Sequence, residues 1–158
     1  MNTFFPLLMS KPVLVGLHLG FAIIGIDFFL WLLGEFIAEP VKRFRLRIVA
    51  FIGLAGFLLS WIIGGYYYIK FYGPLVKPII KAGAAPWAHA VAMETKEHVF
   101  LFIIPMALTA LFISFLSKEQ FSNSKLKLPT ILFIGSMVAV ALAIGAMGYI
   151  ISAAARWS

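Results

Sequence analysis

Residues 129–153, PTILFIGSMVAVALAIGAMGYIISA, form a run without a single charged side chain. A helix needs about 20 predominantly apolar residues to cross about 30 Å of hydrocarbon, and this run is long enough. Three more runs of the same kind lie at residues 12–34, 47–69 and 97–117. The sequence therefore predicts an all-α integral membrane protein, with four transmembrane helices bundled into a single domain over residues 1–158.

The composition is also typical of an integral membrane protein. Hydrophobic residues make up 63% of the chain, charged residues only 12%, and the mean hydropathy is +1.02. The first run is too long for a signal peptide and no small-residue cleavage site follows it, so we expect a mature helix. The net charge of +7 is expected to serve membrane anchoring, because no nucleic-acid-binding motif accompanies it.

Cysteine is absent from the chain. Its absence excludes thiol oxidoreductases with paired cysteines, iron–sulfur ligation and covalent c-type haem attachment. A redox group in this chain is therefore expected to be held by imidazole, carboxylate or thioether groups.

Basic residues predict the orientation. The loop between the first two runs holds Lys42, Arg43, Arg45 and Arg47, and the loop between the last two holds Lys118, Lys125 and Lys127. Lysine and arginine concentrate in short cytoplasmic loops, so both termini and the outer loop at residues 70–96 are expected outside. The predicted location is a bacterial or archaeal cytoplasmic (inner) membrane, which the chain crosses several times.

The outer loop is the longest segment between the apolar runs. It follows a cluster of aromatic residues that is expected to form an anchoring girdle at the interface, Tyr66, Tyr67, Tyr68, Phe71 and Tyr72. Gly73-Pro74, Lys77-Pro78 and the Gly83–Pro86 run are expected to break any helix there. Pro86 then suits the first turn of a helix that continues into the third apolar run.

All three histidines fall at the same end of the predicted bundle. Imidazoles at one depth can ligate a haem or a metal ion, or relay protons. His89 and His98 are nine residues apart, about 180° round an unbroken helix, so they cannot bind one ion together. We expect His98 to face the bundle, because it lies at the N-terminal end of the third apolar run. The Gly16–Gly20 spacing around His18 predicts a close helix contact that places His18 inside the bundle.

Acidic residues are few, and three of them are candidates for a functional role. Asp27 lies near mid-membrane, where a charged carboxylate costs at least a few kcal/mol. It is expected to face a cavity or a partner or to stay protonated, either as a hydrogen-bonded neutral group or in a proton-handling role. Glu94 shares a helix face with His98, and Glu97 is a second candidate for proton handling.

Small residues in the second and fourth runs suit tight seams between helices. The second run carries Gly53, Gly56, Gly64 and Gly65, and the fourth carries Gly135, Ala139 and Ala143.

Residues 17–27, Leu-His-Leu-Gly-Phe-Ala-Ile-Ile-Gly-Ile-Asp, are followed by a short basic loop and a glycine-rich second run. This first half of the chain resembles small bacterial membrane proteins of the copper-resistance D type and their relatives, the four-helix protoporphyrinogen oxidases. The resemblance implies haem or copper chemistry at the outer face. The family's early histidine in helix one and lysine at the start of helix three would be His18 and Lys96. Residues 93–98, Met-Glu-Thr-Lys-Glu-His, depart from the family pattern.

Three functional hypotheses follow. The first is an electron-transfer protein, or a redox subunit of a larger membrane assembly, with a b-type haem near the outer face between helices one and three. His18 and His98 would be the axial ligands, Glu94 or Glu97 could pass protons, and the tyrosines at residues 66–68 could line an entry for quinol.

The second hypothesis is a copper- or zinc-handling membrane protein without haem. Its ligands would come from a mixed set of imidazole, carboxylate and thioether groups, His18, His89, His98, Glu94, Glu97 and Met93. The third is a structural or assembly subunit whose histidines are hydrogen-bonded interface residues. The expected partners are the lipid bilayer, other membrane subunits or a second copy in a homodimer, and quinone under the first hypothesis; nucleic acid is not expected.

Overall fold

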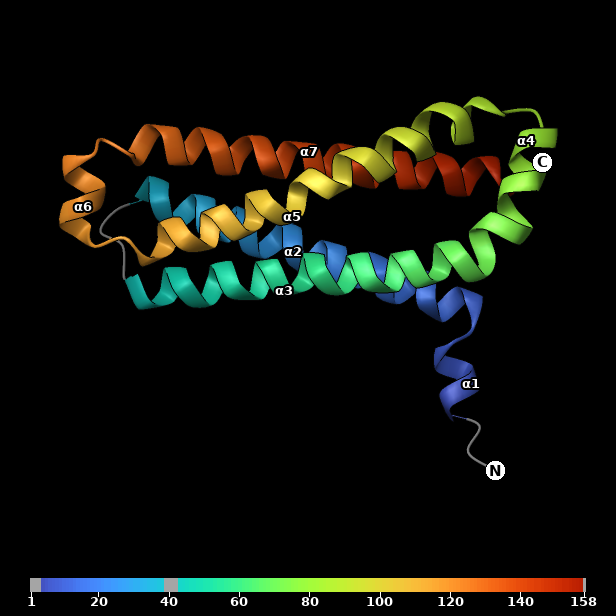
Figure 1. The fold of residues 1–158 in the computed structure, drawn as a ribbon, viewed down its shortest axis with the longest axis horizontal. Coiled ribbons are helices and arrows are strands. Elements are labelled where there is room, and N and C mark those ends of the chain that lie inside the picture. The colour runs from blue at the N-terminus through green and yellow to red at the C-terminus, as the bar shows by residue number, and fades with distance from the viewer. Residues whose placement is uncertain (1–3, 39–42, 158) are drawn as a thin grey trace.

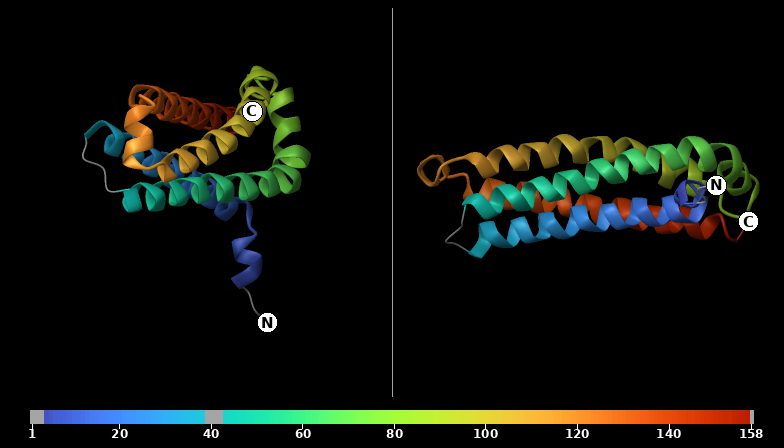
Figure 2. Two further views of the ribbon diagram at one scale, coloured as in Figure 1. Left: turned by 60° about the vertical axis from the view of Figure 1, so that its left-hand side comes forward. Right: turned by 90° about the horizontal axis from the view of Figure 1, so that it is seen from below.

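The computed structural model describes residues 4–38 and 43–157, and all of its elements are helical (Figure 1). Four stretches are long and apolar enough to cross a membrane, Lys11–Ala38, Arg43–Ala82, Ala88–Phe115 and Lys127–Ala154. The long helices lie alongside one another as a bundle (Figure 2). The prediction of an all-α chain with four such helices is confirmed.

The elements divide these stretches further. They are α1 (Phe4–Leu8), α2 (Lys11–Ala38), α3 (Arg43–Tyr67), the π-helix η1 (Tyr68–Val76), α4 (Lys77–Ala82), the π-helix η2 (Ala88–Met93), α5 (Glu94–Phe115), α6 (Lys118–Asn123) and α7 (Lys127–Ala154). The beginning of α2, the end of α7, α4 and η2 lie at one end of the bundle, which we call the terminal end (Figure 1).

Within the predicted outer loop at residues 70–96, the expected helix breaks at Gly73-Pro74 and Lys77-Pro78 are absent, and that part of the prediction is wrong. The helix of α3 continues through Gly73-Pro74 as η1 and then into α4. Proline lacks an N–H, and in η1 the bonds reach five residues back, as from the Lys77 N–H to the carbonyl of Tyr72. Pro78 lies in the first turn of α4, where no N–H is needed. The chain leaves the helix only at residues 83–86, and Pro86 opens the helix that leads into α5, as expected.

The opposite end of the bundle is held by charged and aromatic contacts. Arg45 forms an ion pair of 2.6 Å with Glu35, which also accepts a hydrogen bond from the indole of Trp31. The guanidinium groups of Arg43 and Arg47 lie over the rings of Phe121 and Phe115. Lys42, which belongs to the basic loop of the orientation prediction, lies outside the described residues.

Helices α2 and α3 approach each other most closely at glycine. A Cβ atom added to Gly56 would lie 2.8 Å from the backbone nitrogen of Gly25 and 3.0 Å from the carbonyl oxygen of Phe21. One turn away the rings of Phe29 and Phe57 stack with their centroids 5.5 Å apart. The tight seam predicted from the glycines of the second apolar run is therefore present at Gly56.

Two buried clusters of side chains fill the bundle. The larger one joins α2, α3, α5 and α7 and contains Phe29, Leu32, Leu46, Ile103 and Met137. The smaller one closes the terminal end and contains Tyr72, Val76, Ile80, Ala88, Met93 and Ile151. The polar residues discussed below lie at the terminal end, around this smaller cluster.

Candidate functional site

His18 on α2 is tied to Ser60 on α3. Its Nδ1 lies 2.9 Å from the carbonyl oxygen of Ser60 and 3.0 Å from the Ser60 hydroxyl. That hydroxyl donates in turn to the carbonyl oxygen of His18, at 3.0 Å. Because a carbonyl only accepts, Nδ1 carries the proton, and in the neutral ring the lone pair is left on Nε2. Two helices therefore fix both the position and the tautomer of this imidazole.

The imidazole of His18 fits against α3 because Gly64 has no side chain. A Cβ atom at Gly64 would lie 2.6 Å from Nδ1 and 2.8 Å from Cε1 of the ring. Ser60 and Gly64 are one helical turn apart, so the first bonds the ring while the second makes room for it. The expectation that His18 lies inside the bundle is confirmed. The neighbouring Gly16 and Gly20, however, face away from the bundle.

Lys96 on α5 reaches into the same region. Its ammonium lies beside α7 at Gly148, where an added Cβ would be 3.6 Å from Nζ, and it interacts electrostatically with His18. Within the described residues the Lys96 ammonium makes no hydrogen bond and no ion pair. The two positions implied by the family resemblance, far apart in the sequence, therefore interact electrostatically, and Lys96 also interacts with the carboxylate of Glu97, the next residue along α5.

A second polar group lies where η1 meets η2. The hydroxyl of Tyr72 is 3.1 Å from Nδ1 of His89, and Nε2 of His89 is 3.5 Å from a carboxylate oxygen of Glu94. Tyr72 and His89 are only 2% and 4% exposed, whereas the side chain of Glu94 is 44% exposed. Burial of a polar ring costs free energy unless it is hydrogen-bonded, and the tyrosine hydroxyl meets that need. His89 thus connects the interior to the surface through Glu94.

His98 does not face the bundle, and that prediction is wrong. Its side chain is exposed, and its Nδ1 lies 2.6 Å from the carbonyl oxygen of Glu94 on the same helix. The histidine that points inward is His89. The nine-residue spacing correctly placed the two rings on different sides. The choice between them was wrong because it relied on the apolar run after His98, whereas the small residues around His89, Ala88 and Ala92, are buried in the smaller cluster at the terminal end.

Asp27 is exposed on α2, facing away from the bundle. It forms no hydrogen bond or ion pair with any residue that the structure describes. The expectation that it faces a cavity or a partner is therefore not met within this chain. Its carboxyl group also lies apart from His18, which faces α3.

The aromatic cluster of residues 66–72 does not behave as one girdle. Tyr66 is 40% exposed, as an interfacial anchor should be, but Tyr72 is buried and bonded to His89. Tyr68 stacks on Tyr72 with ring centroids 5.2 Å apart and interacts with Glu97. The inner tyrosines and Glu97 therefore belong to the polar group at the terminal end.

The proposed metal ligands do not converge on one point. No group of three histidine, aspartate or glutamate side chains able to hold an ion occurs in the described part of the chain. His89 and Glu94 are adjacent, but His18 faces α3 and His98 points outward. One imidazole and one carboxylate make an incomplete shell.

Sequence reasoning missed Ser60 and the role of Tyr72. A serine in an otherwise apolar stretch, one turn before a glycine, was the available signal for Ser60, since a membrane-embedded hydroxyl usually bonds a neighbouring helix. Tyr72 had no distinguishing signal among its aromatic neighbours, because burial there depends on how η1 and η2 pack.

The Tyr72–His89 hydrogen bond gives a first prediction. Tyr72→Phe removes the hydroxyl and leaves Nδ1 of a buried histidine without its partner, which should lower the free energy of unfolding by about 1–3 kcal/mol. Thermal unfolding followed by circular dichroism in detergent measures the change. Tyr149→Phe, at an exposed tyrosine of α7, is the matched control and should leave the midpoint unchanged. Equal midpoints for the two variants would contradict the assigned bond.

Comparison with known proteins identifies no relative of this chain. No protein-family model matches the chain, and neither a curated protein nor a solved structure shows significant similarity to it. The resemblance to proteins of the copper-resistance D type therefore stays a prediction, which rests on the residues described above.

Proposed function

We propose that the chain is a multi-pass protein of a bacterial or archaeal cytoplasmic membrane, with the terminal end and both termini outside. We further propose that it is a redox protein, or the redox subunit of a larger membrane assembly, which holds a b-type haem near His18 and Lys96. The observation that carries this proposal is the hydrogen bond from Nδ1 of His18 to the carbonyl of Ser60.

That bond supports ligation by His18 for a chemical reason. Metal-ligating histidines commonly donate the N–H of one ring nitrogen to a carbonyl or carboxylate, which orients the ring and leaves the other nitrogen free to bind. The Ser60 carbonyl supplies this partner from a different helix. In this proposal Nε2 of His18 would hold the haem iron, and the haem would supply one-electron transfer.

Lys96 supports the same position. A haem carries propionates that need cationic partners in an apolar setting, and the Lys96 ammonium interacts electrostatically with His18 while it forms no ion pair or hydrogen bond with a described residue. His98 lies on the face of α5 that points away from the bundle, so the proposal does not include paired ligation by His18 and His98. The proposal therefore assigns haem binding in this chain to His18 and not to His98.

The polar group formed by Tyr72, His89 and Glu94 supports a proton-coupled reaction, with quinol as the expected electron donor. Oxidation of a quinol releases protons, which need a way to water. His89 and Glu94 lead from the buried Tyr72 to an exposed carboxylate, and Glu97 with Tyr68 lies on the inner side of this group. The proposed role of these side chains is to move protons between the site and the outer surface.

The visible spectrum of the detergent-purified protein after addition of haemin, oxidised and dithionite-reduced, tests this function, together with metal analysis of the same sample before the addition. A stoichiometric Soret band with α and β bands on reduction is the expected result. A protein that binds no haem but carries stoichiometric copper or zinc would replace the proposal with the haem-free alternative. A protein that binds neither would contradict both and favour an assembly subunit.

Lys96 offers a prediction about the haem potential. A nearby positive charge stabilises the reduced, electron-richer state, so Lys96→Met should lower the midpoint potential. A redox titration followed by visible spectroscopy measures it. Lys118→Met, at the opposite end of the bundle, is the control and should leave the potential unchanged. An unchanged potential in Lys96→Met would place the haem away from Lys96.

A further inference from the structure

The face of α2 that points away from the bundle carries three glycines that the packing of this chain does not require. A Cβ atom added to Gly16, Gly20 or Gly34 would meet nothing within 4 Å, whereas one at Gly25 would collide with the ring of Phe57. Gly25 is therefore required by the packing inside this chain, and the other three glycines are not. A face that only met lipid would have no need of bare backbone.

The outward residues follow a regular spacing of four and three. They are Gly16, Gly20, Ile23, Asp27, Leu30 and Gly34, all exposed, and we call this row the outward seam. The buried residues of α2 lie on the opposite side, Leu14, Gly25, Phe29, Leu32 and Phe36. Alternating steps of four and three bring residues onto one stripe that another helix can pack along.

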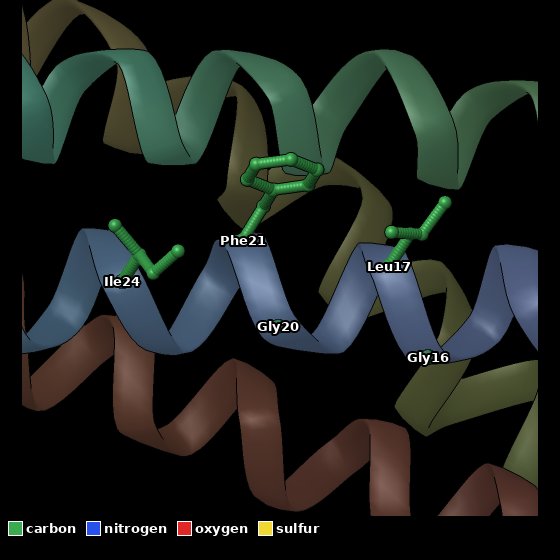
Figure 3. Close-up of a pocket in the computed structure, with 5 residues that line it drawn as sticks. All are labelled: Gly16, Leu17, Gly20, Phe21 and Ile24. Carbon is green, nitrogen blue, oxygen red and sulfur yellow. The ribbon is translucent and has the colours of Figure 1, made fainter.

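The surface is hollowed at one end of the outward seam. A groove of about 170 Å³ is lined by Gly16, Leu17, Gly20, Phe21 and Ile24. Figure 3 shows that Gly16 and Gly20 present no side chain beside those of Leu17, Phe21 and Ile24. Such a spacing of glycines lets two helices in a membrane approach closely.

Asp27 lies two turns further along the same row and is the second, independent observation. Its carboxyl group has no partner among the described residues, although α2 is apolar enough to cross a membrane. An ionisable side chain facing hydrocarbon alone is unfavourable by at least a few kcal/mol. Whatever covers the outward seam must therefore offer Asp27 a hydrogen bond at the same depth.

A second copy of the chain meets both needs at once. A two-fold axis along the membrane normal sets each residue of the seam opposite its own counterpart, so glycine meets glycine and Asp27 meets Asp27. Two adjacent carboxyl groups cannot both be ionised, and the protonated one donates a hydrogen bond to the other. We propose that the protein forms a parallel homodimer along the outward seam of α2.

The absence of cysteine makes this contact easy to probe. Ile23→Cys and Leu30→Cys each place one thiol on the seam, and Leu142→Cys and Phe112→Cys place one on exposed positions of α7 and α5. The variants are reconstituted into vesicles at a low protein-to-lipid ratio, oxidised, and separated on a non-reducing gel. We expect disulfide-linked dimers for the seam variants and monomers for the controls. Equal cross-linking at seam and control positions, or none at either seam position, would overturn the proposal.

Asp27 provides a second readout that does not depend on oxidation. Asp27→Leu should weaken dimerisation in vesicles about tenfold, measured by energy transfer between labelled copies over a dilution series in lipid. Asp27→Asn should retain it, because an amide both donates and accepts hydrogen bonds. An Asp27→Leu protein that dimerises as tightly as the unmodified chain would contradict the role of the carboxyl pair. A chain that stays monomeric throughout would overturn the proposal.

Discussion

Replacing His18 with alanine is expected to abolish the Soret band of haem-loaded protein. The change removes the only axial ligand that the proposal assigns to this chain, and it leaves the Ser60 carbonyl without the ring that it orients. His18 makes its described hydrogen bonds only to Ser60, so the helical content should remain. We expect loss of most of the bound haem at equal protein concentration, measured by visible spectroscopy after addition of haemin.

His98→Ala is the matched control for that experiment. His98 lies at the same end of the bundle, but its ring is exposed and bonded to its own helix, so the Soret band should be retained. Loss of haem in both variants would restore the paired ligation by two histidines. Loss in His98→Ala alone would contradict the assignment of His18.

Gly56→Ala is expected to destabilise the fold, although alanine normally favours a helix. The added Cβ would meet backbone atoms of Gly25 and Phe21, which cannot move aside as a flexible side chain can. The helices α2 and α3 would have to separate, at a cost of about 1–3 kcal/mol in the free energy of unfolding. Thermal unfolding followed by circular dichroism in detergent measures this change.

The control for the crowding argument is Gly145→Ala on α7. An added Cβ at Gly145 meets nothing within 4 Å, so this variant should gain about 0.5–1 kcal/mol from the better helix propensity of alanine. Opposite signs for the two substitutions are the expected result. If Gly56→Ala were as stable as Gly145→Ala, the close approach of α2 and α3 would be wrong.

The long helices and the α2–α3 seam could be predicted because their signals are local. An uncharged run such as residues 129–153 has few alternatives to a helix, and the glycines of the second run indicated a close helix contact, which is present at Gly56. The proline rule failed at Pro74 for a physical reason. A π-helix accommodates the missing donor by bonding five residues back, so proline there widens the helix and does not end it.

The candidate site was only partly predictable. His18 could be placed in the bundle from its neighbours, but its pairing with Ser60 depends on the register between α2 and α3, which no local pattern encodes. His98 was expected to face inward because an apolar run follows it, but His89 is the buried one, since the small residues beside it pack into the cluster at the terminal end. Exposure of Asp27 likewise follows from the packing of the whole bundle.

The two π-helices have a consequence for how the chain tolerates change. Each wide turn holds about one residue more than an α-turn, so it acts as an insertion that rotates everything after it by about 100°. Tyr72 lies in η1 and His89 in η2, and their bond depends on both rotations. Deleting one residue from either segment would let it rewind as an α-helix and turn the pair apart. In these two segments the number of residues is therefore constrained more tightly than their identity.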